Sequence, residues 1–404
     1  MQNPFLLELA KEFGTPLFVY DAEKMTAQYK RLINAFGDLK LDVHYACKAL
    51  NNLAVLQHFR SLGAGLDTVS IQEVQLGLKA GFLPEQIMYT PNGVSFEEIQ
   101  AAVKLKVKVN IDNLVMLEKF GNEYGSSYPV CVRLNPHIVA GGNHKIQVGH
   151  IDSKFGISIH QMRHLTRIVE AYKINVNGLH MHTGSDILDV GVFLRGTELL
   201  LEAAFHFKQL EYIDLGSGFK VAYRPNDVST DIEELGTKLT EQFQTFCKEY
   251  GRPLQLAFEP GKFLVSESGL FLAKVNVIKQ TTATVFAGVD SGFNHFIRPM
   301  FYDSYHHITN VSNPDGDERI YTVVGYICET DTFAWDRKIA EINENDILAF
   351  HNAGAYLYAM SSNYNSRLRP AEVLIVKGKA HLISRRETLD DILKTQVDVS
   401  GLFS

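Results

Sequence analysis

Residues 65–90, GLDTVSIQEVQLGLKAGFLPEQIMYT, contain two short β-rich runs on either side of an amphipathic helical segment. The apolar stripe of that segment includes Ile71, Val74, Leu76 and Leu78. Gly81 follows the stripe and suits the left-handed position that commonly ends a helix. A strand, a helix and a second strand in this order predict two parallel strands joined by a crossover helix.

The same alternation of β-rich runs and helical segments extends over the first two-thirds of the chain. The β-rich runs begin at Leu41, Gly65, Gln86, Lys108, Tyr128, Val176, Tyr212 and Leu254. Eight strand–helix units predict an α/β fold in the form of a TIM (β/α)8 barrel. An open doubly wound sheet is the alternative, but it typically carries a G-x-G-x-x-G fingerprint after its first strand, and this chain has none.

The character of the sequence changes after residue 267, where β-rich runs with tight turns replace the strand–helix alternation. This part predicts a second, all-β domain of the sandwich or barrel-like type. The run PLFVYD at residues 16–21 is also strand-like and can pair into that domain. We therefore expect the barrel to occupy residues 24–267 and the β domain to comprise residues 1–23 and 268–404.

Composition excludes several classes of protein. The 404 residues are 46% hydrophobic and 21% charged, enough for a sizeable core, and the net charge of −7 argues against a mainly electrostatic nucleic-acid binder. No apolar run approaches the roughly 18 residues of a membrane span, and the start of the sequence lacks the basic region of a signal peptide. The four cysteines are scattered without a CxxC pair, so we expect a cytoplasmic protein with no disulfide framework and no metal site.

The ends of the predicted barrel strands carry the candidate chemistry. Side chains alternate along a strand, so in LDVHYACKA (residues 41–49) the face of Asp42, His44, Ala46 and Lys48 is expected to point into the barrel. An inward lysine is costly unless it is paired or used. A salt-bridged barrel lysine is the ordinary interpretation of Lys48, and a lysine that forms a Schiff base is the functional one.

Other strand ends add groups that complement this amine. His182 and Ser185 lie in the run GLHMHTGS, Gly216, Ser217 and Gly218 follow YIDL, and Glu259 closes LQLAFE. Together these ends supply an amine, an aromatic ring, a carboxylate and glycine amides that can approach an anion. Pyridoxal phosphate requires that combination. Taken singly, His182 is more often a core histidine and Glu259 an ion-pair partner.

The motifs resemble one family along nearly the whole chain. They are YACKAL, GLDTVS, RLNP with HIDSKFGI, GLHMHTGSD, DLGSGF, EPGK, FIRPMFYDSYH, CET, NAGAY and RRET, in the expected order. The chain resembles the fold-type III, alanine-racemase-like decarboxylases that depend on pyridoxal 5'-phosphate, and in particular the branch that acts on diaminopimelate. The resemblance implies conversion of meso-2,6-diaminopimelate to L-lysine and CO2, the last step of lysine biosynthesis.

The resemblance also implies roles for residues of the barrel. Lys48 aligns with the lysine that links covalently to the cofactor and takes part in catalysis. His182 aligns with the histidine that stacks on the cofactor ring. Ser185 and the loop Gly216, Ser217 and Gly218 align with phosphate contacts. Glu259 aligns with the acid at the pyridine nitrogen.

Further roles are implied for the substrate side. Arg298 and Tyr302 align with residues that grip the distal carboxylate of the substrate. Cys328 aligns with a catalytic cysteine and Glu329 with a contact to the substrate amine, both reaching in from the partner subunit of a homodimer with shared active sites. Tyr356 aligns with a tyrosine near the phosphate or the substrate. Cys47, Cys131 and Cys247 are expected in the core, and Cys328 taken alone is expected to be a small buried hydrophobe.

Several positions depart from the pattern of the family. Lys262 stands where arginine usually follows EPG, so it keeps the charge of a predicted substrate contact but loses the bidentate fork. Asp186 stands where glutamine is usual and places a negative charge near the site. Among the smaller departures, Asn51 comes one place later than usual, and Ser217 stands in the middle of the glycine loop. After CET the aspartate comes one position early, as Asp331, with Thr332 at the position where it is expected, and Asn352 replaces the acid often found before AGAY.

Two other interpretations stay open at this point. One is a related enzyme, such as carboxynorspermidine decarboxylase or another amino-acid decarboxylase of the same fold, against which the IRPMFY and RRET segments argue. The other is a catalytically inactive binding homologue. The presence of Lys48, His182, Glu259 and Cys328 argues against it.

Overall fold

The computed structural model describes residues 1–138 and 153–403, so His150–Asp152 of the HIDSKFGI motif lie outside the described residues. The chain divides into two compact units. One unit contains residues 24–222 and 226–265, and the other contains residues 1–23, 223–225 and 266–404. The division adds the short segment 223–225, which the sequence did not indicate, to the second unit.

The first unit is a closed barrel of eight parallel strands, as predicted. Its strands are β2 (Leu41–Ala46), β3 (Gly65–Thr68), β4 (Ile87–Tyr89), β5 (Lys108–Ile111), β6 (Val130–Asn135), β8 (Val176–His180), β9 (Tyr212–Asp214) and β10 (Gln255–Phe258). Strand β10 pairs with β2, and β5 pairs with β6, which closes the ring. A short strand, β7 (Ile157–Ser158), adds to the edge of β6.

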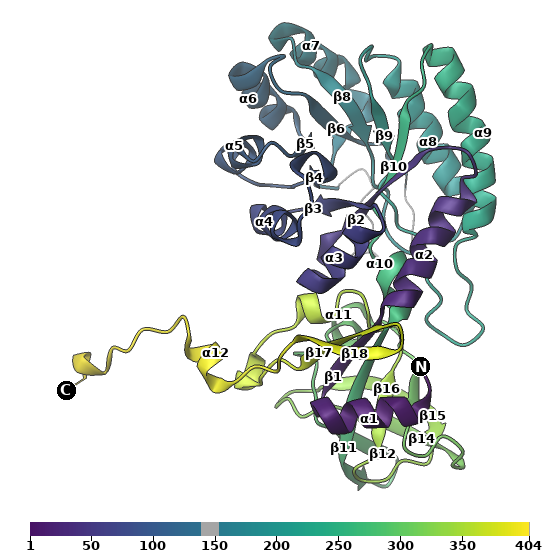
Figure 1. Cartoon of the computed structure of the whole chain (residues 1–404), viewed down its shortest axis with the longest axis vertical. Coiled ribbons are helices and arrows are strands. Elements are labelled where there is room, and N and C mark those ends of the chain that lie inside the picture. The colour runs from purple at the N-terminus through teal and green to yellow at the C-terminus, as the bar shows by residue number, and fades with distance from the viewer. Residues whose placement is uncertain (139–152, 404) are drawn as a thin grey trace. The chain divides into compact units, whose positions relative to one another are not determined.

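Helices surround the barrel strands in Figure 1. They are α2 (Ala22–Ala35), α3 (Leu53–Ser61), α4 (Ile71–Ala80), α5 (Phe96–Lys104), α6 (Leu114–Tyr124), α7 (Met162–Tyr172), α8 (Val190–Ala204), α9 (Ile232–Tyr250) and the short α10 (Lys262–Val265). The Ser70 hydroxyl caps the start of α4, and Gly81 ends it at φ 93°. Gly77 belongs to the buried face of α4, because a Cβ there would lie 2.5 Å from Leu66 on β3.

The second unit is the predicted β domain, and its nine strands form one mixed sheet. Its strands are β1 (Leu17–Asp21), β11 (Gly269–Gln280), β12 (Val285–Val289), β13 (Ile308–Asn310), β14 (Glu318–Val324), β15 (Thr332–Ala340), β16 (Ile347–Phe350), β17 (Ala371–Val376) and β18 (Lys379–Ser384). The predicted strand near the N-terminus is confirmed as β1, which pairs antiparallel with β11 and parallel with β17.

Three helices belong to this second unit: α1 (Asn3–Phe13), α11 (Arg298–Tyr302) and α12 (Leu389–Leu393). Leu6 and Leu9 of α1 are buried against the apolar face formed by β1, β11 and β17. Burial of each leucine contributes about 1.5–3 kcal/mol, which holds this helix on the sheet. In the described ranges, no helix is long and apolar enough to cross a bilayer.

Candidate active site

Lys48 lies in a single 3-10 turn, Cys47–Ala49, immediately after β2. Its Nζ is 2.8 Å from Oδ2 of Asp67, at the end of the neighbouring strand β3, and its side chain is 42% exposed. The Tyr45 ring stacks on Phe59 of α3, so the alternate face of β2 meets the helix layer as predicted. The salt bridge holds the amine at a position that ligands can reach. It agrees with the interpretation of Lys48 as a salt-bridged barrel lysine, and it leaves the Schiff-base interpretation open.

Glu259 follows β10 and is buried among barrel residues. Its Oε2 is 3.0 Å from His180 Nε2, and Thr90 donates a hydrogen bond of 3.4 Å to Oε1. Burial opposes ionisation, but the attraction and hydrogen bond of His180, together with Lys48, hold the pKa of Glu259 well below its usual range. Glu259 is therefore an anion, which makes it suited to pairing with a protonated ring nitrogen.

Two further buried carboxyl groups differ from Glu259 in the direction in which their pKa is shifted. Burial and the charge of Glu259 raise the pKa of Asp67, and the same causes raise the pKa of Asp214 far above its usual range. Asp214 Oδ1 accepts the backbone N–H of Gly216 at 2.8 Å. The barrel therefore holds one strongly acidic carboxylate beside two weaker acids, a separation that is typical of catalytic sites.

The glycine loop after β9 packs tightly on the segment that follows β8. A Cβ on Gly216, at φ +61°, would lie 2.7 Å from His182 Nδ1, and a Cβ on Gly218, at φ +106°, would lie 2.1 Å from the carbonyl oxygen of Gly184. Both positions need glycine, since no side chain fits and the backbone is left-handed. The loop thus forms a cradle that a Cβ would fill, and its backbone remains open to close approach by an anion.

His182 is fixed in orientation by this loop. Its Nδ1 accepts the backbone N–H of Ser217 at 3.3 Å, and the Ser217 hydroxyl donates to the carbonyl oxygen of Glu259 at 2.9 Å. Burial, followed by repulsion from Arg133 and Lys48, lowers the pKa of His182 to about 3. A neutral imidazole held in one orientation can pack flat on an aromatic ligand without adding charge to it.

Lys262 is buried, and its ammonium group interacts with two neighbouring side chains of the same chain. Its ammonium donates a hydrogen bond of 3.0 Å to the Ser185 hydroxyl and forms a short ion pair with the Asp186 carboxylate. Ser185 lies next to Gly184, which contacts the glycine loop. The structure therefore brings two departures from the family pattern, Lys262 and Asp186, together at the edge of the cradle. A substrate contact of Lys262 remains a prediction.

The barrel residues fit pyridoxal phosphate. An amine, a neutral aromatic ring, an ionised carboxylate and a glycine cradle arise from the ends of β2, β8, β10 and β9. In the part of the chain that the structure describes, the buried Asp67 Oδ1 and His180 Nδ1 atoms also lack hydrogen-bond partners. His180, Asp214 and Glu259 lie close enough to bind a metal ion, with ligand atoms within 4.8 Å of one another. The His180–Glu259 hydrogen bond and the weak acidity of Asp214 favour a hydrogen-bond network instead.

The β unit contributes a second cluster around Arg298, the first residue of α11. Arg298 is buried, and its guanidinium lies 5.3 Å from the ring centre of Tyr223 and 5.6 Å from that of Tyr302. It donates a hydrogen bond of 3.2 Å to the Ser304 hydroxyl, while its buried Nε has no partner. Among the described residues no carboxylate forms a salt bridge with Arg298, so this buried cation suits an anionic ligand.

Cys328 and Glu329 lie on an exposed turn between β14 and β15. The expectation that Cys328 taken alone is buried is wrong: its thiol is exposed, while Cys47 and Cys131 are buried as predicted and Cys247 is half-buried. Tyr364 donates a short hydrogen bond to the Glu329 carboxylate. The early aspartate, Asp331, accepts the backbone N–H groups of Phe293 and Ile327 at 2.7 and 3.0 Å, which fixes this turn.

Sequence reasoning missed several residues of both clusters. Asp67 and Asp214 lie within the motifs GLDTVS and DLGSGF, and His180 lies within GLHMHTGSD, but the sequence predicted no role for any of the three. The available signal was a polar residue at the last position of a barrel strand, as for His180 and Asp214, or next to it, as for Asp67. Tyr223 lacked any such signal, since it meets Arg298 from a segment 75 residues earlier. Tyr356 is half-buried with a left-handed φ of 57°, and its predicted role stays a prediction.

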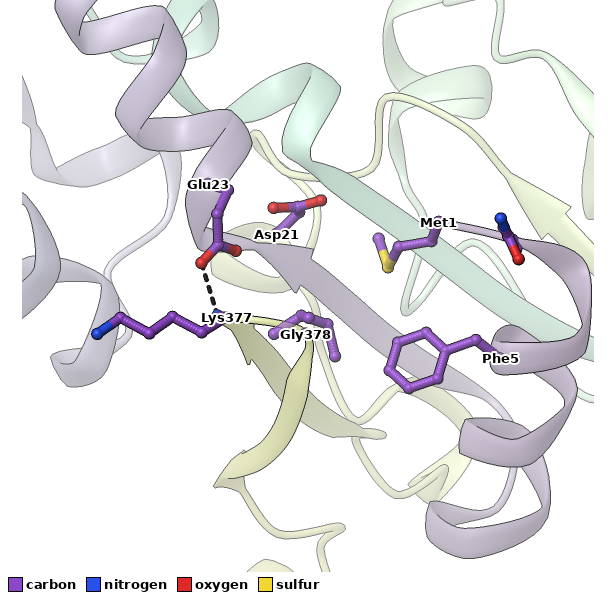
Figure 2. Close-up of a pocket in the computed structure, with 8 residues that line it drawn as sticks. Met1, Phe5, Asp21, Glu23, Lys377 and Gly378 are labelled. Atoms are coloured by element: carbon purple, nitrogen blue, oxygen red, sulfur yellow. Dashed lines mark hydrogen bonds between the residues drawn. The ribbon is translucent and has the colours of Figure 1, made fainter.

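A separate cavity of about 430 Å³ lies within the β unit, and Figure 2 shows its lining. Its wall combines apolar residues such as Met1 and Phe5 with Asp21 and Glu23. Glu23 accepts the backbone N–H of Lys377 at 2.6 Å. None of the predicted site residues lines this cavity, so it takes no part in the candidate active site.

Comparison with known proteins gives consistent matches. The pyridoxal binding domain of pyridoxal-dependent decarboxylases matches residues 22–266. The chain is 39% identical to a diaminopimelate decarboxylase of Methanothermobacter thermautotrophicus, over 96% of this chain and 93% of the relative. It is 32% identical to that of Vibrio cholerae, over 96% and 94%.

Solved structures agree with these matches. Diaminopimelate decarboxylase of M. jannaschii in complex with L-lysine has 30% identity and a TM-score of 0.90, covering 98% of this chain and 95% of that one. A lysine/ornithine decarboxylase of Vibrio vulnificus, with 22% identity and a TM-score of 0.81, covering 93% and 98%, shares the fold.

Proposed function

The chain belongs to the diaminopimelate decarboxylases, a branch of the pyridoxal-dependent decarboxylases, and from this premise we propose how its residues perform the reaction. The protein is a carboxy-lyase that depends on pyridoxal phosphate and converts meso-2,6-diaminopimelate to L-lysine and CO2. The observation that carries the assignment of residues is the ionised, buried Glu259 in the same barrel as the Lys48 amine and the glycine cradle.

Five groups of the barrel are proposed to hold the cofactor. Lys48 would bind it covalently, Glu259 would pair with the ring nitrogen and His182 would pack on the ring. Ser185 and the loop Gly216, Ser217 and Gly218 bind the phosphate through the hydroxyl and backbone N–H groups. When bound, the cofactor supplies an electron sink for the bonding pair that carbon dioxide leaves behind. Glu259 supports that sink because its low pKa keeps a negative charge beside the ring nitrogen.

Proton transfer falls to two groups of this chain. After loss of carbon dioxide the substrate carbon needs a proton, and we assign its delivery to the Cys328 thiol, with the Lys48 amine as the alternative donor. Asp67 is 2.8 Å from Lys48 Nζ and holds that amine at the end of β2. We also propose a cytoplasmic location, because a thiol that acts as a proton donor has to stay reduced.

Substrate choice is proposed to depend on the distal end of the molecule. Arg298, which has no carboxylate partner among the described residues, binds the distal carboxylate with Tyr302 beside it. Glu329 receives the distal amine, and Tyr356 lies near the substrate or phosphate. Ornithine has no distal carboxylate, so it leaves a buried cation unpaired, which costs binding energy.

The exposed turn with Cys328 and Glu329 supports the proposal of a homodimer whose subunits complete each other's sites. Two inactive variants test it, Lys48→Ala and Cys328→Ala. If the groups act across subunits, hybrids formed by mixing the two variants contain one intact site and recover up to about a quarter of the wild-type activity at random assortment. Absence of recovery, with hybrid formation verified by mass, contradicts the shared site.

Release of CO2 from four substrates tests the proposed function. We expect turnover of meso-2,6-diaminopimelate and little or none of carboxynorspermidine, ornithine or lysine. A preference for carboxynorspermidine would overturn the assigned substrate but not the assigned reaction, decarboxylation. A purified sample that develops no visible absorbance with pyridoxal phosphate would contradict the assigned cofactor site.

A further inference from the structure

Lys262 and Asp186 form an ion pair in which both members depart from the family pattern. The pair joins the start of α10 to the segment after β8, across 76 residues of sequence, and Lys262 is 6% exposed while Asp186 is 27% exposed at the side chain. The same ammonium donates to Ser185. Since Ser185 follows Gly184, which the glycine loop contacts, the pair lies at the margin of the proposed phosphate cradle.

The two charges cancel at a place where an anion is expected to bind. A lone lysine beside the cradle would attract phosphate, and a lone aspartate would repel it. With both present the pair has no net charge, and two of the three N–H donors of Lys262 already have acceptors in the chain. What remains for an anion is the Ser185 hydroxyl and backbone amides, with at most one donor from Lys262.

We propose that Asp186 weakens the affinity of this cradle for free anions by neutralising Lys262, so that inorganic phosphate competes poorly with pyridoxal phosphate. The inference rests on the proposed cofactor site, because it concerns the phosphate subsite of that cofactor. Pyridoxal phosphate retains the bond to Lys48 and the contact with Glu259, which inorganic phosphate lacks. Asp186 thus acts as a specificity-determining residue that favours the whole cofactor over its phosphate group alone.

Direct binding of inorganic phosphate to the apoenzyme, measured by calorimetry, tests this inference. Asp186→Asn removes the negative charge, and asparagine tolerates the φ of +61° found at position 186. We expect phosphate to bind about tenfold more tightly to this variant. Lys262→Gln leaves Asp186 unpaired, and phosphate should bind about tenfold more weakly. The double variant should return to within about threefold of the wild type, because its net charge at the pair is again zero.

Two controls separate charge from structure. Lys262→Arg keeps the positive charge and should stay within about threefold of the wild type. Lys238→Gln and Glu234→Gln make the same charge changes in an exposed pair of α9, and neither should alter phosphate binding. Asp186→Gly provides a second variant without the carboxylate that accepts a positive φ. Melting temperatures show that each variant is folded.

The outcome for Asp186→Asn decides the inference. Tighter phosphate binding supports it, and unchanged or weaker binding in both Asp186→Asn and Asp186→Gly overturns it and leaves the pair a structural strut. Visible absorbance of the same samples after addition of pyridoxal phosphate tests the cofactor site separately. If the wild type binds the cofactor but the Asp186 variants bind phosphate no more tightly than it does, this inference alone is refuted. If the wild type never binds the cofactor, the proposed function is refuted.

Discussion

The two clusters of candidate site residues differ in how their charges are satisfied. In the barrel, Lys48 pairs with Asp67, His180 with Glu259, and Lys262 with Asp186. In the β unit, the buried Arg298 contacts aromatic rings and a serine hydroxyl but forms no salt bridge among the described residues.

The contrast shows which of the two clusters is organised by side-chain pairs of its own unit. Side-chain pairs within the barrel orient Lys48, Glu259 and Lys262, and such preorganisation is the arrangement that efficient catalysis requires. The Arg298 cluster has an unsatisfied buried charge, and such a group gains most from a ligand of opposite sign. This difference agrees with the proposed roles, catalysis for the barrel residues and substrate selection for the Arg298 cluster.

The largest expected effect comes from the Lys48–Asp67 pair. Lys48→Arg preserves a cation for Asp67 but removes the primary amine, so the barrel should stay folded while decarboxylation falls by at least about 1,000-fold. The visible absorbance of the bound cofactor should change at the same time. Lys79→Arg, on the exposed side of α4, is the matched control. Activity within tenfold of the wild type would mean that the pair is structural.

Glu259→Gln tests whether the charge of the second pair matters. An amide keeps the shape but cannot hold a negative charge beside a protonated ring nitrogen, so kcat should fall by about 100- to 1,000-fold. It also leaves His180 without its carboxylate. Thr90→Val removes only the longer hydrogen bond to Glu259 and should cost less than about tenfold. Equal losses of kcat in the two variants would mean that Glu259 acts through its hydrogen bonds rather than through its charge.

The barrel strands and several residues at their ends could be predicted from the sequence, but the partners of those residues could not. Strand–helix alternation revealed all eight barrel strands, because a parallel barrel repeats one local unit. Strand-end position identified Lys48, His182 and Glu259. The partners of these residues come from other strands, as Asp67 does for Lys48, and a single sequence does not specify such a contact.

Mixed pairing in the β unit was missed for a related physical reason. A strand pattern gives the faces of a strand but not the direction of its neighbour, so the parallel pairing of β1 with β17 was not foreseen. Lys262 and Asp186 were seen as two separate departures, and the structure makes them one pair.

Arg298→Met tests the selective role of the second cluster. Loss of a charged hydrogen-bond donor should lower kcat/KM for meso-2,6-diaminopimelate by about 30- to 100-fold, mainly through KM. Turnover of a substrate without a distal carboxylate, such as lysine or ornithine, should not fall. The preference of the enzyme for meso-2,6-diaminopimelate over these substrates should therefore become smaller. Arg319→Met, at an exposed pair on β14, controls for the loss of one positive charge. An equal loss with every substrate would contradict a distal-carboxylate contact.

The smallest expected effect concerns acid stability, and it follows from the burial of His306 and from the charge of Arg298. Burial, followed by repulsion from Arg298, lowers the pKa of His306 to about 3, although its hydrogen bond to the His351 carbonyl oxygen opposes this shift. Folded His306 is therefore neutral at pH values where an unfolded histidine, with a pKa of about 6.5, takes up a proton. Proton uptake favours unfolding, so His306 should cost the fold up to about 1.4 kcal/mol for each pH unit below 6.5, until the pH reaches its folded pKa.

His306→Asn removes this titration while keeping a side-chain donor for the His351 carbonyl oxygen. Urea unfolding of the wild type and the variant in parallel, at pH 6.5 and 5.5, gives the loss of stability over that interval. The loss should be smaller in the variant by about 1 kcal/mol. His164→Asn, on the exposed surface of α7, should leave the loss unchanged and serves as the control. An identical loss in wild type and His306→Asn would mean that His306 is not held neutral, and that the Arg298 cluster tolerates a second positive charge without an anionic ligand.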